Sequence, residues 1–294
     1  YAMGISSGSA TDQFLASKSG RTAHSTISYA ESHDEERMAY KVVNYGANAT
    51  IKESTDVQMR RLGSVAAQML LTPGAHMIWQ FGELGADQTT KNASGNDTGA
   101  KRVIWNYLDD TDRLGLHDSY RELCRLRRDN PDLFVEDNIT TMMMAQNNWA
   151  NTCRVLRLAN GSKELILVCN PTPSGATARN VAVSFGTSDN SNYTIASQSH
   201  GADASFDASK GQVTIAPHNY VVITNSAVAG IESAGNDQES GIRVYGSDGR
   251  IVIDGDYDTA EIYSVSGQRQ ASFAVPAGVY IVRVDGRSYK VMVQ

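Results

Sequence analysis

The chain has 294 residues, and its composition excludes several classes of protein before any motif is considered. Apolar residues make up 41% of it, which is enough for real hydrophobic cores, and the length allows two or three domains. The net charge of -6 and the lack of a basic stripe argue against a nucleic-acid partner. No apolar run approaches the roughly 18 residues of a membrane-spanning helix, so we expect no transmembrane segment.

The three cysteines are too scattered for a zinc site. Cys124, Cys153 and Cys169 form no CxxC pair and no cluster with histidine. Cys153 and Cys169 flank an expected hairpin, which leaves two interpretations open: one disulfide between them, or two free buried thiols.

Residues 1–136 carry the signals of alternating strands and helices. We expect a strand at 26–30, a helix at 56–71, a second strand at 75–80 and a helix near 110–128. Strands that alternate with crossover helices pair in parallel. Two such units cannot close a barrel or cover both faces of a sheet. We therefore expect this region to be the end part of a larger α/β domain.

Residues 137–227 indicate an all-β domain. Apolar strand patterns surround Asn160-Gly161, which is a strong signal for a hairpin turn, and they recur at 181–185, 213–215 and 220–224. Short strands separated by turns in this way predict an antiparallel β-sandwich.

The last part of the chain predicts a linker and a further β module. Residues 228–241 are rich in glycine, alanine, serine and glutamate, as linkers are. Residues 242–294 repeat the strand pattern on a smaller scale. The run at 254–258 begins like a calcium loop but lacks the later glycine and glutamate of an EF-hand, so we expect an acidic turn and no metal ligands there.

The polar run 31–37 directly follows the first expected strand. In an α/β barrel the active site forms at the C-terminal ends of the strands, so the His33-Asp34 pair is a candidate for chemistry. A solvated turn with a capping aspartate has the same composition. Composition alone leaves both interpretations open.

Ser32-His33-Asp34, preceded by a strand, resembles the fourth signature region of the α-amylase family of glycoside hydrolases, at the end of barrel strand seven. Residues 73–85 are similar to the family's eighth strand, with Pro-Gly, an apolar run, then glycine and glutamate. The match continues in order to about residue 227. The resemblance implies the C-terminal part of a (β/α)8 TIM barrel, with strands 7 and 8 and their helices, followed by an antiparallel β-sandwich domain and a small β-sandwich tail.

The resemblance also implies roles for individual residues. Retaining glycosidases need a nucleophile and a general acid, which the family carries on strands four and five and which we expect to lie outside this chain. Asp34 matches the third carboxylate, the transition-state stabiliser, and His33 matches the histidine that hydrogen-bonds the same sugar. We further expect Glu31 and Arg37 either to line the substrate cleft or to pair with each other at the surface, and we expect Trp105 to stack on a sugar ring.

The implied activity is the hydrolysis of α-1,4-glucans such as starch, by a retaining mechanism in the intact protein, with this chain inactive alone. Two alternatives stay open: a glucan branching enzyme or other transglycosylase of the same family, and a non-catalytic glucan-binding or interaction protein. The expected partner is an α-glucan polysaccharide or oligosaccharide. We expect no cofactor in this chain, since the family's usual calcium site lies in other parts of the intact protein.

Residues 278–284 and 290–293, with the strand and turn at 260–267, resemble the C-terminal sorting domain of type IX secretion in Bacteroidota. This resemblance implies export by the secretion machinery, and a secreted or cell-surface protein associated with the outer membrane. An ordinary carbohydrate-binding or fibronectin-like module is the alternative.

Overall fold

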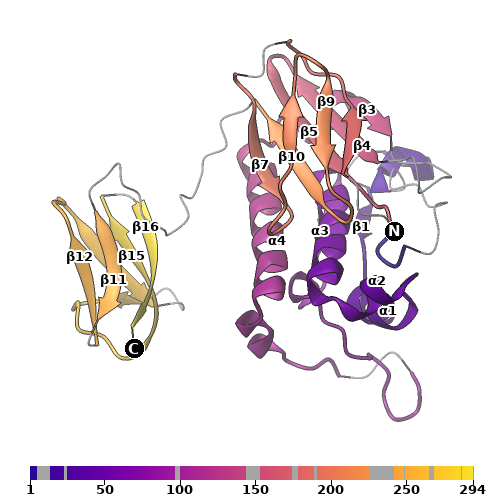
Figure 1. The fold of residues 1–294 in the computed structure, drawn as a ribbon. Coiled ribbons are helices and arrows are strands. Elements are labelled where there is room, and N and C mark those ends of the chain that lie inside the picture. The colour runs from indigo at the N-terminus through magenta and orange to yellow at the C-terminus, as the bar shows by residue number, and fades with distance from the viewer. Residues whose placement is uncertain are drawn as a thin grey trace. The chain divides into compact units, whose positions relative to one another are not determined.

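The computed structural model forms two compact units, Tyr1–Val228 and Ala229–Gln294 (Figure 1). The predicted linker, 228–241, lies outside the residues that the structure describes. No helix in the described part of the chain is long and apolar enough to cross a membrane. The described residues are 1–4, 14–22, 25–96, 100–143, 153–173, 178–188, 191–225, 242–247, 249–264, 268–285 and 287–293.

The first unit begins with a parallel pair of strands joined by helices, as the sequence predicts. Strand β1 (Ile27–Tyr29) lies beside β2 (Ala75–Met77), with Ser28 opposite His76. Between them run three helices, α1 (Met38–Tyr45), α2 (Ala49–Glu53) and α3 (Thr55–Leu71). The parallel register brings the C-terminal ends of both strands to the same edge, which is the edge where ligands bind in α/β folds.

The second strand is shorter than the predicted 75–80, because the chain turns after Met77. Phe81 adopts a left-handed backbone conformation, with φ of 64°, and leads into a 3-10 turn, η3 (Gly82–Leu84). The final helix of this region is α4 (Thr111–Asp129), preceded by the 3-10 turn η4 (Trp105–Asp109).

Side chains satisfy the backbone groups at both ends of α3. Ser54 caps its N-terminus by accepting a hydrogen bond from the Val57 amide. At its C-terminal end Arg127, on α4, donates to the carbonyls of Leu70 and Thr72, at 2.7 and 3.0 Å. These are carbonyls without a helical partner, so the guanidinium both caps α3 and joins it to α4.

The predicted antiparallel sandwich is present, and α3 and α4 form a third layer on it (Figure 1). Strands of one sheet run in the order β3-β4-β5-β10-β7, and those of the other in the order β6-β9-β8. In the part of the chain that the structure describes, the larger sheet contains β3 (Ile139–Met143), β4 (Arg154–Asn160), β5 (Lys163–Cys169), β7 (Thr194–Gln198) and β10 (Tyr220–Thr224). The smaller sheet has β6 (Arg179–Ala182), β8 (Ser205–Asp207) and β9 (Gln212–Ile215). The 3-10 turn η5 (Glu136–Asn138) precedes β3.

The middle strands of the larger sheet, β4, β5 and β10, are buried on both faces, which explains why β5 and β10 are almost continuously apolar. Leu156 and Leu167 point to the core shared with the helices. Val155 and Val168, their neighbours, point to the core between the two sheets. Strands covered on both sides lose the alternation of apolar and polar residues that a half-exposed strand shows.

Alternating side-chain directions along β4 also determine whether two of the cysteines can form a disulfide. Cys169 pairs with Arg154 across β4 and β5 and lies in the helix-facing core. Cys153, one residue earlier, lies in the core on the other face. Successive side chains of a strand point to opposite faces, so the two thiols are buried apart and are free rather than bridged.

The described residues of the second unit form six short strands, in the region where the sequence predicts a β module. A hairpin of β11 (Arg243–Ser247) and β12 (Arg250–Asp254) accompanies a sheet of order β14-β13-β15-β16. That sheet contains β13 (Ala260–Ser264), β14 (Arg269–Gln270), β15 (Gly278–Val284) and β16 (Arg287–Val293). The acidic turn after β12 is fixed by Asp285, whose carboxylate accepts hydrogen bonds from the amides of Asp258 and Thr259.

Candidate active-site loop

The loop 31–37 leaves the C-terminal end of β1 and carries the predicted catalytic Asp34 and the predicted substrate-binding His33 at its exposed tip. His33 and Asp34 are both exposed to solvent. Beside them the chain that leaves β2 contributes Trp79, whose ring centroid lies 5.8 Å from that of His33. The parallel register of β1 and β2 thus brings two segments more than 40 residues apart to one small surface.

Asp34 is held as a charged carboxylate by its neighbours. The Ser32 hydroxyl donates a hydrogen bond to Asp34 Oδ1 at 2.7 Å. That bond, with the nearby His33 and Lys101 charges, lowers the pKa of Asp34 below its usual value. An ionised, exposed carboxylate can accept hydrogen bonds from sugar hydroxyls and can stabilise positive charge that develops on a sugar ring.

Glu31 and Arg37 differ from the expectation that they bind substrate directly. Both are buried, with 6% and 4% of their surface exposed, and they form an ion pair of 2.8 Å with each other. Glu31 also accepts the Met38 amide at 2.7 Å, and Arg37 donates to the Gln80 carbonyl at 2.6 Å. Burial raises the pKa of Glu31, and the Arg37 charge opposes that shift. The pair therefore joins the loop after β1 to the segment after β2 from inside.

A glycine makes room for this ion pair. A Cβ atom on Gly82 would lie 2.5 Å from Glu31 Oε1, which is closer than real Cβ atoms come to an oxygen. The turn η3, which contains Gly82, can therefore approach the pair only without a side chain at that position. The sequence marks Gly82 as part of the segment 73–85 that is similar to the family's eighth strand. It does not indicate that a buried carboxylate lies against this glycine.

Glu36 anchors the other side of the loop to the segment after η3. Its carboxylate accepts hydrogen bonds from the Thr89 hydroxyl at 2.6 Å and the Thr90 amide at 2.9 Å. Burial works to raise the pKa of Glu36, but these hydrogen bonds outweigh it and the pKa is lowered. Glu35 pairs with Lys41 at 2.6 Å. Sequence reasoning left Glu36 without a role, since nothing near it in the chain marks its threonine partners.

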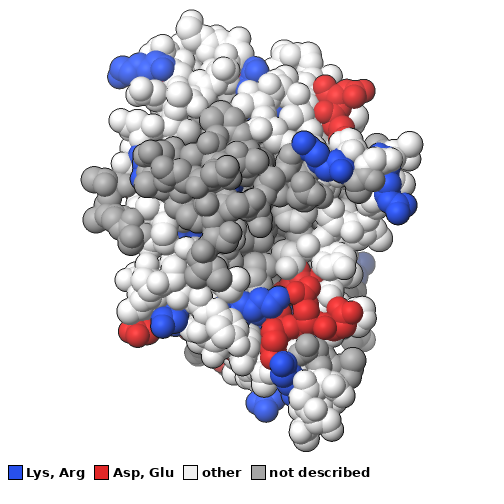
Figure 2. All heavy atoms as spheres, turned by 90° about the vertical axis from the view of Figure 1, so that its right-hand side faces the viewer, with Lys and Arg blue, Asp and Glu red and all other residues white. Residues whose placement is uncertain are grey.

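Charged side chains of both signs are visible on one face of the molecule (Figure 2). On the face that Figure 2 shows, acidic side chains form one group in the lower part, with basic side chains next to it. This face therefore carries mixed charge rather than a field of one sign (Figure 2).

Trp105, the predicted stacking residue, is 62% exposed at the start of η4. Its ring meets that of Phe81 edge-on, with centroids 4.9 Å apart. An exposed indole supported by a buried ring is a platform on which the apolar face of a sugar can lie. Its role in binding stays a prediction.

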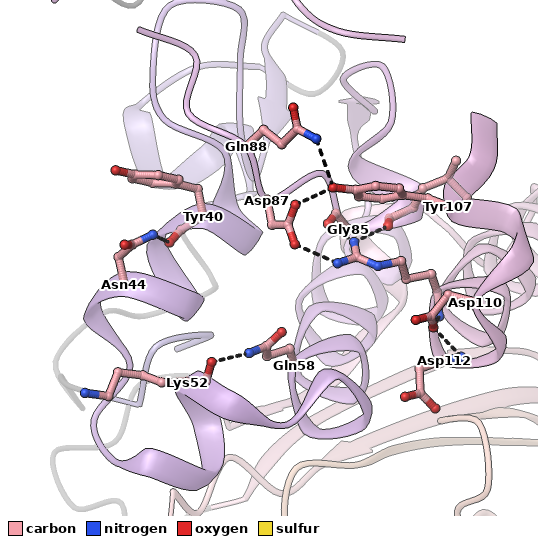
Figure 3. A network of polar contacts seen from close by, with 12 residues as sticks. Tyr40, Asn44, Lys52, Gln58, Gly85, Asp87, Gln88, Tyr107, Asp110 and Asp112 are labelled. Carbon is pink, nitrogen blue, oxygen red and sulfur yellow. Dashed lines mark hydrogen bonds and ion pairs between the residues drawn. The ribbon is translucent and has the colours of Figure 1, made fainter. Parts of the chain in front are cut away.

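A polar network fixes the turn that carries Trp105 (Figure 3). The Tyr107 hydroxyl donates to Asp87 at 2.6 Å and accepts from the Gln88 amide at 3.3 Å. Arg113, on α4, pairs with the other oxygen of Asp87 at 2.6 Å and lies over the Tyr107 ring, 4.0 Å from its centroid. The network ties the segment after η3 to the helix behind it.

Comparison with known proteins finds solved structures that are similar to this chain at low sequence identity. No family model and no curated protein matches the chain. Among solved structures, the product complex of SpuA, a multi-modular glycogen-degrading virulence factor of the pneumococcus, covers 75% of the chain at 13% identity and a TM-score of 0.56. An α-amylase from Geobacillus thermoleovorans, complexed with acarbose, covers 76% at 13% identity and a TM-score of 0.50.

The chain spans 29% of the length of the first of these proteins and 45% of the second. At such identity the likeness concerns the fold and not the chemistry. The chain therefore shares the fold of a part of a glycogen-degrading protein and of a part of an α-amylase.

Proposed function

We propose that the chain belongs to a glycoside hydrolase that acts on α-1,4-glucans by a retaining mechanism, with Asp34 as its transition-state stabiliser. The observation that carries the proposal is the exposed, ionised Asp34 beside His33 at the C-terminal end of a parallel strand, in a fold similar to part of an α-amylase. In this reading the parallel pair β1 and β2 is a segment of a TIM barrel, and the nucleophile and general acid come from its other strands.

The chemistry assigned to Asp34 follows from its surroundings. A retaining glycosidase passes through a transition state with positive charge on the sugar ring. A fixed carboxylate near that ring stabilises the charge, because the protein has already oriented it before the reaction. Ser32 fixes one oxygen of Asp34, which leaves the other for the sugar. His33 adds a neighbouring hydrogen-bond partner for the same sugar unit.

The test uses the intact protein and a matched pair of variants. Asp34→Asn keeps the size of the side chain and removes its charge, so we expect kcat on maltooligosaccharides to fall about 100-fold or more, as removal of one electrostatic group does in other enzymes. Asp109→Asn, on the exposed turn η4, is the control and should keep full activity. Unchanged turnover in Asp34→Asn would contradict the proposal.

Product analysis in the same experiment separates the open alternatives. Shortened chains with free reducing ends support hydrolysis, whereas branched or elongated products would move the assignment to a transglycosylase. Glucan binding without any turnover, unaffected by Asp34→Asn, would favour a non-catalytic binding protein.

For the second unit we propose export through type IX secretion, with the intact protein secreted or at the cell surface. Two paired strands, β15 and β16, coincide with the segments that resemble the sorting domain. A reporter protein fused to residues 229–294 should reach the medium or the outer membrane of a host with this secretion system. A reporter that stays in the periplasm would contradict the assignment.

A further inference from the structure

A series of hydrogen bonds connects the candidate active-site loop, 31–37, to the turn η4. Its first link is Glu36, whose side chain reaches from the loop to the segment after η3. Its Oε1 accepts a hydrogen bond from the Thr89 hydroxyl at 2.6 Å, and its Oε2 accepts one from the Thr90 amide at 2.9 Å. The Thr90 hydroxyl also donates to the Glu35 carbonyl at 3.1 Å. A side chain and the backbone of the loop therefore both hold this segment.

The second link runs from the same segment to η4 (Figure 3). Gln88 donates from its side-chain amide to the Tyr107 hydroxyl at 3.3 Å, and Asp87 accepts from that hydroxyl at 2.6 Å. Trp105 lies two residues before Tyr107 in the same turn. A displacement of the segment would therefore also displace the turn and the indole ring that it presents.

The position of the Trp105 ring depends on the turn beneath it, because 62% of this residue is exposed. Its ring meets that of Phe81 edge-on, with the centroids 4.9 Å apart, and this contact leaves the face of the indole open. Two routes therefore set the distance from Trp105 to Asp34. One is the contact with Phe81 after β2, and the other is the series of hydrogen bonds that begins at Glu36, in the loop that holds Asp34.

The link at Glu36 is made by an ionised carboxylate. Burial acts to raise the pKa of Glu36, but the hydrogen bonds from Thr89 and Thr90 together outweigh it, and the pKa is lowered. Hydrogen bonds to a charged acceptor are about twice as strong as those between neutral groups. A glutamine at this position would offer one acceptor oxygen instead of two, so it could keep only part of the attachment.

We infer that Glu36 is a positioning residue, which holds the Trp105 ring at a fixed distance from Asp34 and so makes the protein favour long glucan chains over short ones. The inference rests on the proposed function, in which Asp34 contacts one sugar unit. A chain that reaches both places gains the stacking contact in addition to the contacts at Asp34, whereas a short chain engages the loop alone. That gain requires the two places to be correctly spaced, so it is lost when the link between them is broken.

The experiment compares kcat/KM of the intact protein on maltotriose and on maltoheptaose, and the ratio of the two values gives the chain-length preference. Glu36→Gln should reduce the preference about three- to tenfold, which corresponds to the worth of one aromatic contact. The loss should come from a higher KM for maltoheptaose, with kcat unchanged. Glu53→Gln makes the same substitution at an exposed glutamate of α2 and should keep the preference. An unchanged preference in Glu36→Gln would overturn the inference.

Variants of Thr89 test the same link from its other side, on an exposed residue. Thr89→Val removes the hydroxyl that Glu36 binds and should lower the preference, whereas Thr89→Ser retains the hydroxyl and should keep it. Equal preference in these two variants would contradict the role of this hydrogen bond.

A double variant separates positioning from a general loss of structure. Trp105→Ala should lower the chain-length preference by itself. Addition of Glu36→Gln to Trp105→Ala should lower it no further, because both changes act on one contact. Losses that multiply in the double variant, or an equal fall of kcat/KM on both substrates in Glu36→Gln, would overturn the inference.

These outcomes are distinguishable from a failure of the proposed function. Absence of turnover in the parent, or full activity in Asp34→Asn, would contradict the proposed function and the inference with it. Turnover that depends on Asp34, with a chain-length preference that does not depend on Glu36, would overturn this inference alone.

Discussion

Glu31 Oε1 lies 2.8 Å from Arg37 Nη2 inside the protein, while the two residues midway between them, His33 and Asp34, are exposed. The ion pair thus closes the base of a loop whose tip bears the candidate chemistry. The charged side chains of the polar run 31–37 therefore fall into two groups, one buried and one exposed. Those at the ends fix the loop, and those at the tip face solvent.

Removal of the buried carboxylate should destabilise the first unit. Glu31→Gln leaves the Arg37 charge buried without its partner, and breaking such pairs costs about 3 to 5 kcal/mol. All three tryptophans precede residue 228, so urea unfolding followed by tryptophan fluorescence reports on this unit. The exposed Glu53→Gln should stay within ~0.5 kcal/mol of the parent. Equal stability of Glu31→Gln and the parent would refute a structural role for the pair.

A side chain at Gly82 should disturb the same pair by contact rather than by charge. In Gly82→Ala the new methyl group meets Glu31 Oε1, and overpacking of this kind costs about 1 to 3 kcal/mol. Gly95→Ala is a useful comparison, because Gly95 has a φ of 81° and open space around it, so its cost comes from the backbone alone. Addition of Glu31→Asp, which shortens the acid, should recover part of the loss in Gly82→Ala and none in Gly95→Ala. The same urea unfolding curves measure each variant.

His218 should make stability depend on pH in mildly acidic solution. Burial, with the charges of Arg61 and Arg60 nearby, lowers the pKa of His218 to about 4, and Arg61 donates to its Nδ1 at 2.9 Å. Between about pH 6.5 and pH 4 the unfolded chain binds a proton at this histidine and the folded chain does not. Stability should therefore fall as the pH drops through this window.

The variant His218→Asn tests that prediction. Asparagine tolerates the left-handed backbone at this position, where φ is 71°, and does not titrate. The parent should lose on the order of 1 to 2 kcal/mol more than the variant between pH 7 and pH 4, allowing for the partly open site. Parallel stability curves for the two proteins would be inconsistent with this assignment.

Ser32 should set the pH at which Asp34 becomes charged. The Ser32 hydroxyl is the largest cause of the low pKa of Asp34, so Ser32→Ala should raise that pKa. NMR titration of the Asp34 carboxyl carbon measures it directly. In the intact protein the acidic limb of the rate profile should move to higher pH. Ser32→Thr retains the hydroxyl and should restore the parent pKa, and a value unchanged in Ser32→Ala would exclude this hydrogen bond as the cause.

Local signals were sufficient for most of the fold. The parallel pair at β1 and β2 and the helix α3 follow from periodicity and from the Thr72-Pro73-Gly74 stop. The sandwich follows from short apolar strands around a strong turn. Its strand order was not predictable, because β10 pairs with β5 and β7 across long stretches of chain, and apolar strands fit many neighbours.

The position of the candidate loop could be predicted from the sequence, but the contacts that its residues make inside the protein could not. His33 and Asp34 are exposed after a strand end, where the sequence predicts them. The burial of Glu31 and Arg37 depends on Gly82 and on the Gln80 carbonyl, more than 40 residues later in the chain. A run of polar residues has no periodicity that would show which of its charged side chains are buried and which are exposed. Trp105 was recognised because it precedes the helix in an open segment, and its exposure agrees with that placement.

The double burial of the strands β4, β5 and β10 has a consequence for how this chain can change in evolution. Leu156 and Leu167 face α3 and α4, and Val155 and Val168 face the second sheet. Recombination that exchanged the sandwich without the two helices would leave an apolar face bare and prone to aggregate. We therefore expect the helices and both sheets to be inherited as a block, with gene rearrangements preferentially preserved at the border near residue 228.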